Sequence, residues 1–200
     1  VDFYVANDAE ENFLWINRGD GRFENDALLS GTAVNAYGVA EASMGIVAED
    51  FDQDRDFDLF ITDDTQETNT LYVNDGKGWF EDQSVVSGLA LPSLPWTGFG
   101  IAALDVENDG DLDLFVANGA VRVIEAQRAA GIEPPLQQPD QLYVNDGMKF
   151  VDARDSAFAT PAVSRGVAMA DLDNDGDSDL VVTVNNGPVQ IFRNDGDSGH

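Results

Sequence analysis

The chain has 200 residues, of which 43% are hydrophobic, and it carries a formal net charge of −28. So acidic a chain is disfavoured as a partner of nucleic acid or anionic membrane surfaces, and no apolar run approaches a membrane span. It has no cysteine, and its single histidine is the last residue, His200. These counts exclude disulfides, thiolate or histidine zinc sites and histidine-based triads within this sequence.

In chain order, one pattern of predicted strands recurs four times. The opening unit has short strands at 2–5, 13–16 and 23–24, with a turn at 17–21. The second unit has a glycine-led strand at 45–48 and an acidic loop at 50–58, followed by strands at 59–62, 71–73 and 79–82. Four antiparallel strands repeated at about 50 residues are typical of a β-propeller blade.

The third unit has strands at 100–103, 114–117, 142–144 and 150–152, with an acidic loop at 105–113. The fourth has strands at 166–169, 180–184 and 191–192, with an acidic loop at 171–179. An insertion at 121–140 lengthens the third unit; residues 123–130 have helix-forming composition, whereas Pro134 and Pro135 require extended backbone. We expect it to cross one face of the blade, as either a tolerated insertion or a binding loop.

This pattern predicts an all-β fold made of four-stranded antiparallel β-propeller blades, in a partial propeller of about three and a half blades. The predicted units are a partial blade at 1–30, blades at 44–86 and 98–155 (with the insertion 121–140), and a partial blade at 165–196. Their strand counts are three, four, four and three. The exposed sheet edges of such a segment favour a place in a longer chain or an assembly.

The acidic loops carry carboxylates at positions 1, 3, 5, 7 and 9, which would repel one another without a cation. Oxygen ligands at positions 1, 3, 5 and 9, a carbonyl at position 7 and a turn glycine at position 6 are typical of a calcium loop. Position 12 of the last loop is Val182, inside a predicted strand, where an EF-hand has glutamate. The spacing therefore predicts calcium turns between strands, and three such turns in register are a specific signal.

The recurring Gly-x-Ala-x-x-Asp-x-Asp-x-Asp-Gly-Asp-x-Asp-Leu pattern, joined to Leu-Tyr-x-Asn-Asp-Gly and a Phe-x-Asp strand, resembles the FG-GAP/VCBS repeats of integrin-α-like propellers. The motifs at 138–147, 164–166, 171–180 and 193–196 resemble the repeats that precede an ASPIC/UnbV domain, as in the cartilage acidic protein-like group. This resemblance covers nearly the whole chain. It implies an extracellular or surface seven-bladed calcium-binding propeller, usually without catalytic activity.

The resemblance also implies the ligands of three Ca²⁺ sites. They are Asp50, Asp52, Asp54, Asp56 and Asp58; Asp105, Glu107, Asp109, Asp111 and Asp113; and Asp171, Asp173, Asp175, Asp177 and Asp179. Position 7 is expected to contribute its backbone carbonyl. Arg55 replaces the turn glycine of the first loop, which costs strain at positive φ and places a cation beside that site. Glu107 is one methylene longer than aspartate, so we rank the third site first, the second next and the first last.

The function predicted from these observations is that of a non-catalytic extracellular recognition or adhesion segment, with calcium in a structural role. We expect an unknown protein or glycan ligand, no nucleic acid, no membrane insertion, and an extracellular, cell-surface or periplasmic location, where millimolar calcium suits weak sites. Two alternatives remain: a propeller polysaccharide lyase or hydrolase, and a structural subunit of a surface assembly or filament.

Two further motifs allow a functional and a structural interpretation. Residues 18–20 spell Arg-Gly-Asp, an adhesive tripeptide, but they occupy a hairpin turn position of the repeat, which explains them without a receptor. Trp15, Trp79, Tyr72 and Tyr143 lie at predicted strand positions, where packing between blades is expected. Trp96 lies in a loop between units and is the better candidate for ligand contact.

Overall fold

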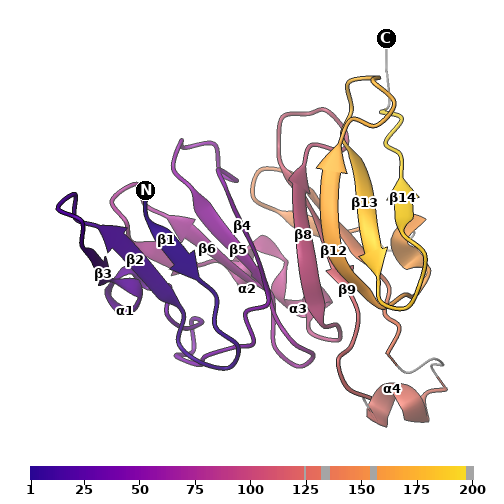
Figure 1. The fold of residues 1–200 in the computed structure, drawn as a ribbon, viewed down its shortest axis with the longest axis horizontal. Coiled ribbons are helices and arrows are strands. Elements are labelled where there is room, and N and C mark those ends of the chain that lie inside the picture. The colour runs from indigo at the N-terminus through magenta and orange to yellow at the C-terminus, as the bar shows by residue number, and fades with distance from the viewer. Residues whose placement is uncertain (124, 132–135, 154–156, 197–200) are drawn as a thin grey trace.

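The computed structural model describes residues 1–123, 125–131, 136–153 and 157–196, and its strands form four antiparallel sheets (Figure 1). Their orders are β1-β2-β3, β4-β5-β6-β7, β11-β10-β9-β8 and β12-β13-β14, so strands adjacent in the sequence pair with each other throughout. The all-β prediction is confirmed, and the sheets have the three, four, four and three strands expected from the sequence.

The strand bounds match the predicted pattern closely. The first sheet contains β1 (Phe3–Val5), β2 (Phe13–Asn17) and β3 (Phe23–Asn25). The second contains β4 (Gly45–Glu49), β5 (Asp58–Thr62), β6 (Thr70–Asn74) and β7 (Phe80–Asp82). The third contains β8 (Gly98–Leu104), β9 (Asp113–Asn118), β10 (Gln141–Asn145) and β11 (Phe150–Asp152), and the fourth contains β12 (Ser164–Ala170), β13 (Asp179–Val184) and β14 (Gln190–Phe192).

Apolar side chains fill the spaces between successive sheets. All five residues of β5 and all six of β9 are buried, because the second and third sheets are covered on both faces. Consecutive side chains of β5 therefore pack into different hydrophobic clusters. Leu59 packs near Tyr4 of the first sheet, whereas Phe60 packs with Leu114 of the third. The outer faces of the first and fourth sheets are open, and Phe3 and Ile191 are 53% and 64% exposed there.

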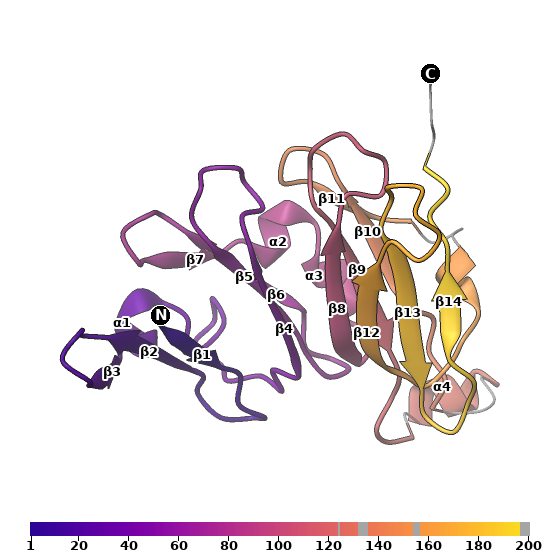
Figure 2. The same cartoon turned by 45° about the horizontal axis from the view of Figure 1, so that its top comes forward.

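The glycine before each acidic loop lies where first strands of neighbouring sheets meet. Strands β4, β8 and β12 run side by side (Figures 1 and 2). A Cβ at Gly45 would collide with the carbonyl oxygen of Phe99, and one at Gly100 would lie 2.7 Å from the carbonyl oxygen of Arg165. Real Cβ atoms do not approach backbone so closely, so Gly45 and Gly100 are packing requirements between sheets. A Cβ at Gly166 would instead lie 3.0 Å from Thr183 of its own sheet.

Short helices join the sheets, and the strand pattern did not predict three of them: α1 (Ala27–Ser30), α2 (Ser84–Ser87) and α3 (Ala90–Ser93). The first two end at Gly31 and Gly88, whose φ values of 88° and 94° form left-handed caps. In the insertion, α4 (Glu125–Ala129) falls in the stretch of helix-forming composition. It lies at the end of the sheets opposite the acidic loops (Figure 1), whereas Pro134 and Pro135 fall outside the described residues.

Candidate metal sites

The three acidic loops join the first strand to the second in the second, third and fourth sheets. They rise from the same end of the sheets, above β4 and β5, β8 and β9, and β12 and β13 (Figure 2). Each loop turns twice through the left-handed region, at positions 4 and 6. Position 6 has φ values of 81°, 96° and 103° at Arg55, Gly110 and Gly176. The expected positive φ at Arg55 is confirmed, and glycine adopts this conformation without the cost that a side chain incurs.

The first aspartate of each loop holds the turn together. Asp105 accepts the N–H groups of Asp109 at 3.1 Å and Gly110 at 2.9 Å. Asp50 accepts the equivalent N–H groups of positions 5 and 6 in the first loop, and Asp171 does so in the third. A carboxylate oxygen retains a lone pair after accepting one hydrogen bond, so the oxygens of Asp50 and Asp105 can still ligate a cation. In the third loop Asp171 Oδ2 can do so as well, whereas Asp171 Oδ1 already accepts two N–H groups.

The ninth position forms a buried bridge that sequence reasoning assigned to metal alone. Asp58 is fully buried; it accepts the N–H of Phe51 in the loop at 3.0 Å and that of Asn74 on β6 at 2.9 Å. Asp113 and Asp179 form the same pair of bonds in the other loops: each accepts the N–H of position 2 of its loop and that of the asparagine that begins the Asn-Asp-Gly turn after the third strand. Burial raises the pKa of Asp58 to about 6, against the lowering effect of these two hydrogen bonds.

The seventh position turns its side chain away from the loop interior. Asp111 accepts the N–H of Gly147 at 2.9 Å, and Gly147 belongs to the Asn-Asp-Gly turn of the same sheet. The carboxylates of Asp56 and Asp177 occupy the space that a Cβ would fill at Gly76 and Gly196, the matching glycines. This arrangement leaves the position 7 carbonyl, rather than its side chain, as the donor available to a cation in the loop.

Carboxylate oxygens converge in two of the three loops. The oxygens of Asp50, Asp52 and Asp58 lie within 4.8 Å of one another, and so do those of Asp171, Asp173 and Asp179; both groups are positions 1, 3 and 9. Within the described ranges, the second loop supplies no such group. Its position 3 is the longer Glu107. Convergence thus favours the first loop over the second, unlike the predicted ranking, which stays a prediction about affinity.

The pKa values of the position 3 side chains are raised where these carboxylates cluster. The pKa of Asp52 is raised by burial and then by the charges of Asp54 and Asp50. Burial and neighbouring carboxylates also raise the pKa of Glu107 and that of Asp173. The raised pKa values show that ionisation of these clustered carboxylates is disfavoured. A bound cation would stabilise the ionised carboxylates and so relieve the repulsion among them.

Arginines lie differently around the first and third loops. Arg55 is exposed and makes no ion pair among the residues that the structure describes. In the third loop, Arg193 lies 3.3 Å from a carboxylate oxygen of Asp173 and also pairs with Asp195. The oxygens of Asp173, Asp175 and Asp195 lie within 4.8 Å of one another. Asp195 was absent from the predicted ligands; its place in an Asn-Asp-Gly turn beside the loop was the available signal.

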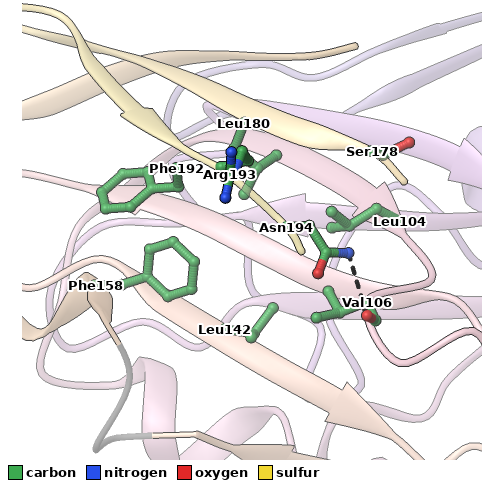
Figure 3. Close-up of a pocket in the computed structure, with 9 residues that line it drawn as sticks. All are labelled: Leu104, Val106, Leu142, Phe158, Ser178, Leu180, Phe192, Arg193 and Asn194. Atoms are coloured by element: carbon green, nitrogen blue, oxygen red, sulfur yellow. Dashed lines mark hydrogen bonds between the residues drawn. The ribbon is translucent and has the colours of Figure 1, made fainter. Parts of the chain in front are cut away.

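A small crevice separates the third and fourth sheets beneath these loops (Figure 3). Its volume is about 90 Å³, and Leu104, Leu142, Phe158, Leu180 and Phe192 give it an apolar lining. At its rim, Asn194 donates to the carbonyl oxygen of Val106 in the second loop at 3.2 Å. The crevice is far below the roughly 300–1,000 Å³ of typical ligand pockets, so we regard it as imperfect packing between two sheets.

The Arg-Gly-Asp tripeptide is partly engaged within its own hairpin. The Arg18 guanidinium contacts Glu24 at 2.8 Å and Asp26 at 2.9 Å. Hydrogen bonding to Glu24 raises the pKa of Arg18. These contacts agree with the structural interpretation of this turn, since an integrin-type receptor would need the guanidinium free.

The tyrosine and tryptophan residues differ in how far they are buried. Tyr72 and Tyr143 are buried between sheets, as expected, but Trp79 precedes β7 and is 61% exposed, so the expectation of packing was wrong for it. Trp96 and Pro139 line a cavity of about 210 Å³ together with Asp140 and Asp152, at the ends of strands opposite the acidic loops. Burial raises the pKa of Asp140 to about 6. This cavity is a candidate ligand contact that lies away from the candidate metal sites.

A second group of acids is buried between the first and second sheets. Asp63 is 1% exposed, and one of its oxygens accepts the N–H of Ser43 at 2.7 Å, while its other oxygen has no hydrogen-bond partner among the described residues. Burial, then the charge of Glu41, raises its pKa well above the ordinary value. Thr70 donates to Glu41 at 3.1 Å. We regard this pair as a feature of the sheet interface, where the crevice has no room for a water molecule.

Comparison with known proteins identifies the repeat. A family model described as FG-GAP-like repeat matches residues 50–116 and 134–182, more than half of the chain. The chain belongs to the FG-GAP-like repeat family. The two matched segments include all three acidic loops.

Three relatives carry the same name, cartilage acidic protein 1. The human protein is 26% identical over 202 residues and the Xenopus tropicalis protein is 27% identical over 199, each covering 96% of this chain. The Mus musculus protein is 30% identical over 129 residues, or 64% of this chain. The FG-GAP chain spans 28% of the human and Xenopus proteins and 17% of the mouse protein.

One solved structure aligns with 98% of the chain and 63% of its own length, at 15% identity and a TM-score of 0.39. It is an Agrocybe aegerita lectin described as recognising non-reducing terminal N-acetylglucosamine. A likeness this weak carries no argument about function. Separately, none of the helices in the described segments has the length and apolar character needed to cross a bilayer.

Proposed function

We propose that the three acidic loops of this FG-GAP chain each bind one calcium ion, and that calcium acts structurally. The observation that carries the proposal is the convergence of position 1, 3 and 9 carboxylates in the first and third loops. All the donors are hard oxygens, and none is nitrogen or sulfur, so calcium or magnesium suits them better than zinc or copper. Calcium tolerates irregular coordination by six to eight oxygens, whereas magnesium demands a near-ideal octahedron.

Each position of a loop would supply a particular kind of oxygen ligand. In the third loop, Asp171, Asp173, Asp175 and Asp179 would supply carboxylate oxygens, and Asp177 its backbone carbonyl; the first and second loops would use the same positions. A bound ion supplies positive charge that cancels repulsion among these carboxylates. Because position 9 also bridges the loop to the third strand, an ion held there would join three strands of one sheet.

Removal of calcium tests this proposal. We expect excess chelator to lower the melting temperature of the chain, because a ligand that binds only the folded state stabilises it by about 2.7 kcal/mol per site at a hundredfold excess over Kd. For a chain of this size that amounts to roughly 5–10 °C per site. Magnesium added to the chelated protein should restore less than calcium. A melting curve that does not move with chelator rejects the proposal.

We also propose that the four sheets are blades of a β-propeller segment, with units at 1–30, 44–86, 98–155 and 165–196. The side-by-side arrangement of β4, β8 and β12 supports this architecture, because a propeller places the first strand of every blade next to its axis. The open outer faces of the first and fourth sheets suit packing against further blades. Small-angle scattering of a longer chain would test for a closed ring.

Finally, we propose a non-catalytic role in extracellular recognition or adhesion, with a protein or glycan as the ligand. The relatives named cartilage acidic protein 1 support this role, as does the suitability of weak calcium sites for millimolar calcium outside cells. The cavity beside Trp96 is the first place to test. Quenching of tryptophan fluorescence by a glycan array hit, lost in Trp96→Ala but kept in Trp79→Ala, would support binding there; equal loss in both would contradict it.

A further inference from the structure

The fourth residue of an acidic loop reaches the loop of the next sheet. Gln53 Nε2 donates to Asp111 Oδ1 at 2.6 Å and to the carbonyl oxygen of Gly110 at 3.1 Å. Asn108 Nδ2 donates to Asp177 Oδ1 at 3.1 Å. In both cases the donor is position 4 and the carboxylate acceptor is position 7 of the following loop. The partners are 58 and 69 residues apart, so the tertiary fold alone creates these contacts.

The accepting aspartate is held from two sides. Asp111 receives Gln53 from the preceding loop and the N–H of Gly147 from the turn of its own sheet. Asp177 receives Asn108 and packs against Gly196 of the equivalent turn. Asp111 is hydrogen-bonded at both oxygens and Asp177 at Oδ1. These bonds restrain the peptide that carries each side chain, and that peptide's carbonyl is the donor assigned to the cation. Position 4 of one loop thus contacts the residue of the next loop whose carbonyl is assigned to the cation.

The third loop contains the same residue without the contact. Asn174 has a φ of 63°, against 56° for Asn108 and 62° for Gln53, so all three residues lie at a similar positive φ. The Asn174 backbone N–H bonds to Asp171, but its side chain makes no hydrogen bond within the described part of the chain. The third acidic loop is the last one in this sequence, so Asn174 has no later loop to contact here. Asn174 has a φ close to that of Asn108 and can therefore serve as its control.

We propose that Gln53 and Asn108 are positioning residues that couple each cation loop to the next, so that calcium bound in one loop raises the calcium affinity of its neighbour. This proposal rests on the proposed calcium function. An ion that orders the second loop also fixes Asn108, and Asn108 then holds Asp177 in place before the third loop fills. Since coupling between sites is reciprocal, calcium in the third loop should favour the second equally. We expect about a fivefold effect, at the low end of measured couplings.

The test follows calcium binding loop by loop in the full 200-residue chain. The amides of Gly110 and Gly176 donate to the first aspartates of the second and third loops, so their NMR shifts report the two loops separately. We expect Asn108→Gly to raise the calcium midpoint of Gly176 about fivefold, whereas Asn174→Gly should leave that of Gly110 unchanged. Glycine accepts positive φ, so neither variant adds backbone strain.

Further measurements separate coupling from simple stability. Asn108→Gln, which gives the second loop the residue that the first loop has, should restore the Gly176 midpoint. If Asn108→Gly lowers only the melting temperature in chelator and leaves the Gly176 midpoint in place, the coupling is refuted while the calcium function stands. If neither glycine amide of the unaltered chain shifts with calcium, the calcium function fails and the coupling with it.

Discussion

The first and third acidic loops bring the same three positions together but balance their charge differently. In the first loop, Asp50, Asp52 and Asp58 converge around a turn that Arg55 strains at a φ of 81°, and Arg55 itself points to solvent. In the third loop, glycine occupies the turn, yet Arg193 pairs with Asp173. The first loop therefore has the more strained turn, whereas the third has a positively charged arginine beside its carboxylates.

This difference shows that a loop's match to the ligand pattern does not by itself rank its affinity. The third loop fits the pattern best, but Arg193 stands where the second and third sheets have Val73 and Val144, immediately before the asparagine of the turn. The guanidinium would compete with calcium for Asp173. Position 6 affects the stability of the turn, whereas the residue before the turn affects the charge available to an ion.

The largest expected effect is at Asp58, the buried bridge of the first loop. With calcium at pH 7, Asp58→Asn should lower the free energy of unfolding by about 2 kcal/mol, since it weakens hydrogen bonds to a charged group. Asp2→Asn, which alters the exposed equivalent that accepts the N–H of Asn17, should cost less in the same thermal unfolding series. Equal losses would show that burial of this position is unimportant.

The same residue should give the metal-free protein a distinctive pH dependence. The folded pKa of Asp58, about 6, exceeds the ordinary value of 3.8. Its contribution to stability is therefore fully present below about pH 4 and is lost as the pH rises through 6. In chelator, the melting temperature should fall between pH 4 and 6, and Asp58→Asn should flatten the fall. With calcium present, the trend should reverse, because the ion binds the ionised carboxylates.

A smaller effect is expected at Arg193. Arg193→Val, which installs the residue of the other sheets, should lower the calcium midpoint of the third loop up to about fivefold, because a partly exposed ion pair contributes at most about 1 kcal/mol. The Gly176 amide shift is the measurement. Arg22→Val, which removes the same charge from a side chain that is 83% exposed, is the control; a matching shift there would indicate a general charge effect.

A change of similar size is expected at the strained turn of the first loop. Arg55→Gly should raise the unfolding free energy by about 1 kcal/mol, because glycine adopts positive φ without the penalty of a side chain. That corresponds to a melting temperature about 2–4 °C higher. Arg55→Ala removes the charge but keeps the strain and should give no such gain. Equal gains in both variants would assign the effect to charge.

Sequence patterns predicted the strands well because each strand and turn is encoded by residues that lie close together in the sequence. Glycine before each acidic loop, β-branched residues after it and Asn-Asp-Gly after the third strand all repeat at fixed offsets, and each encodes a turn or a strand. The short helices α1, α2 and α3 were missed because four residues carry no helical period. Trp79 was misplaced by one position, at the edge where strand assignments are least reliable.

By itself, the sequence determined that the chain is an all-β repeat with three acidic turns, because carboxylate spacing and hairpin glycines act over fewer than ten residues. Only the tertiary structure decided which carboxylates meet, that the ninth aspartate is a buried bridge, that Arg193 lies on the third loop, and that Gln53 and Asn108 hold the next loop's aspartate. These contacts join residues from separate strands or sheets. Their geometry depends on how the sheets pack, which no local spacing encodes.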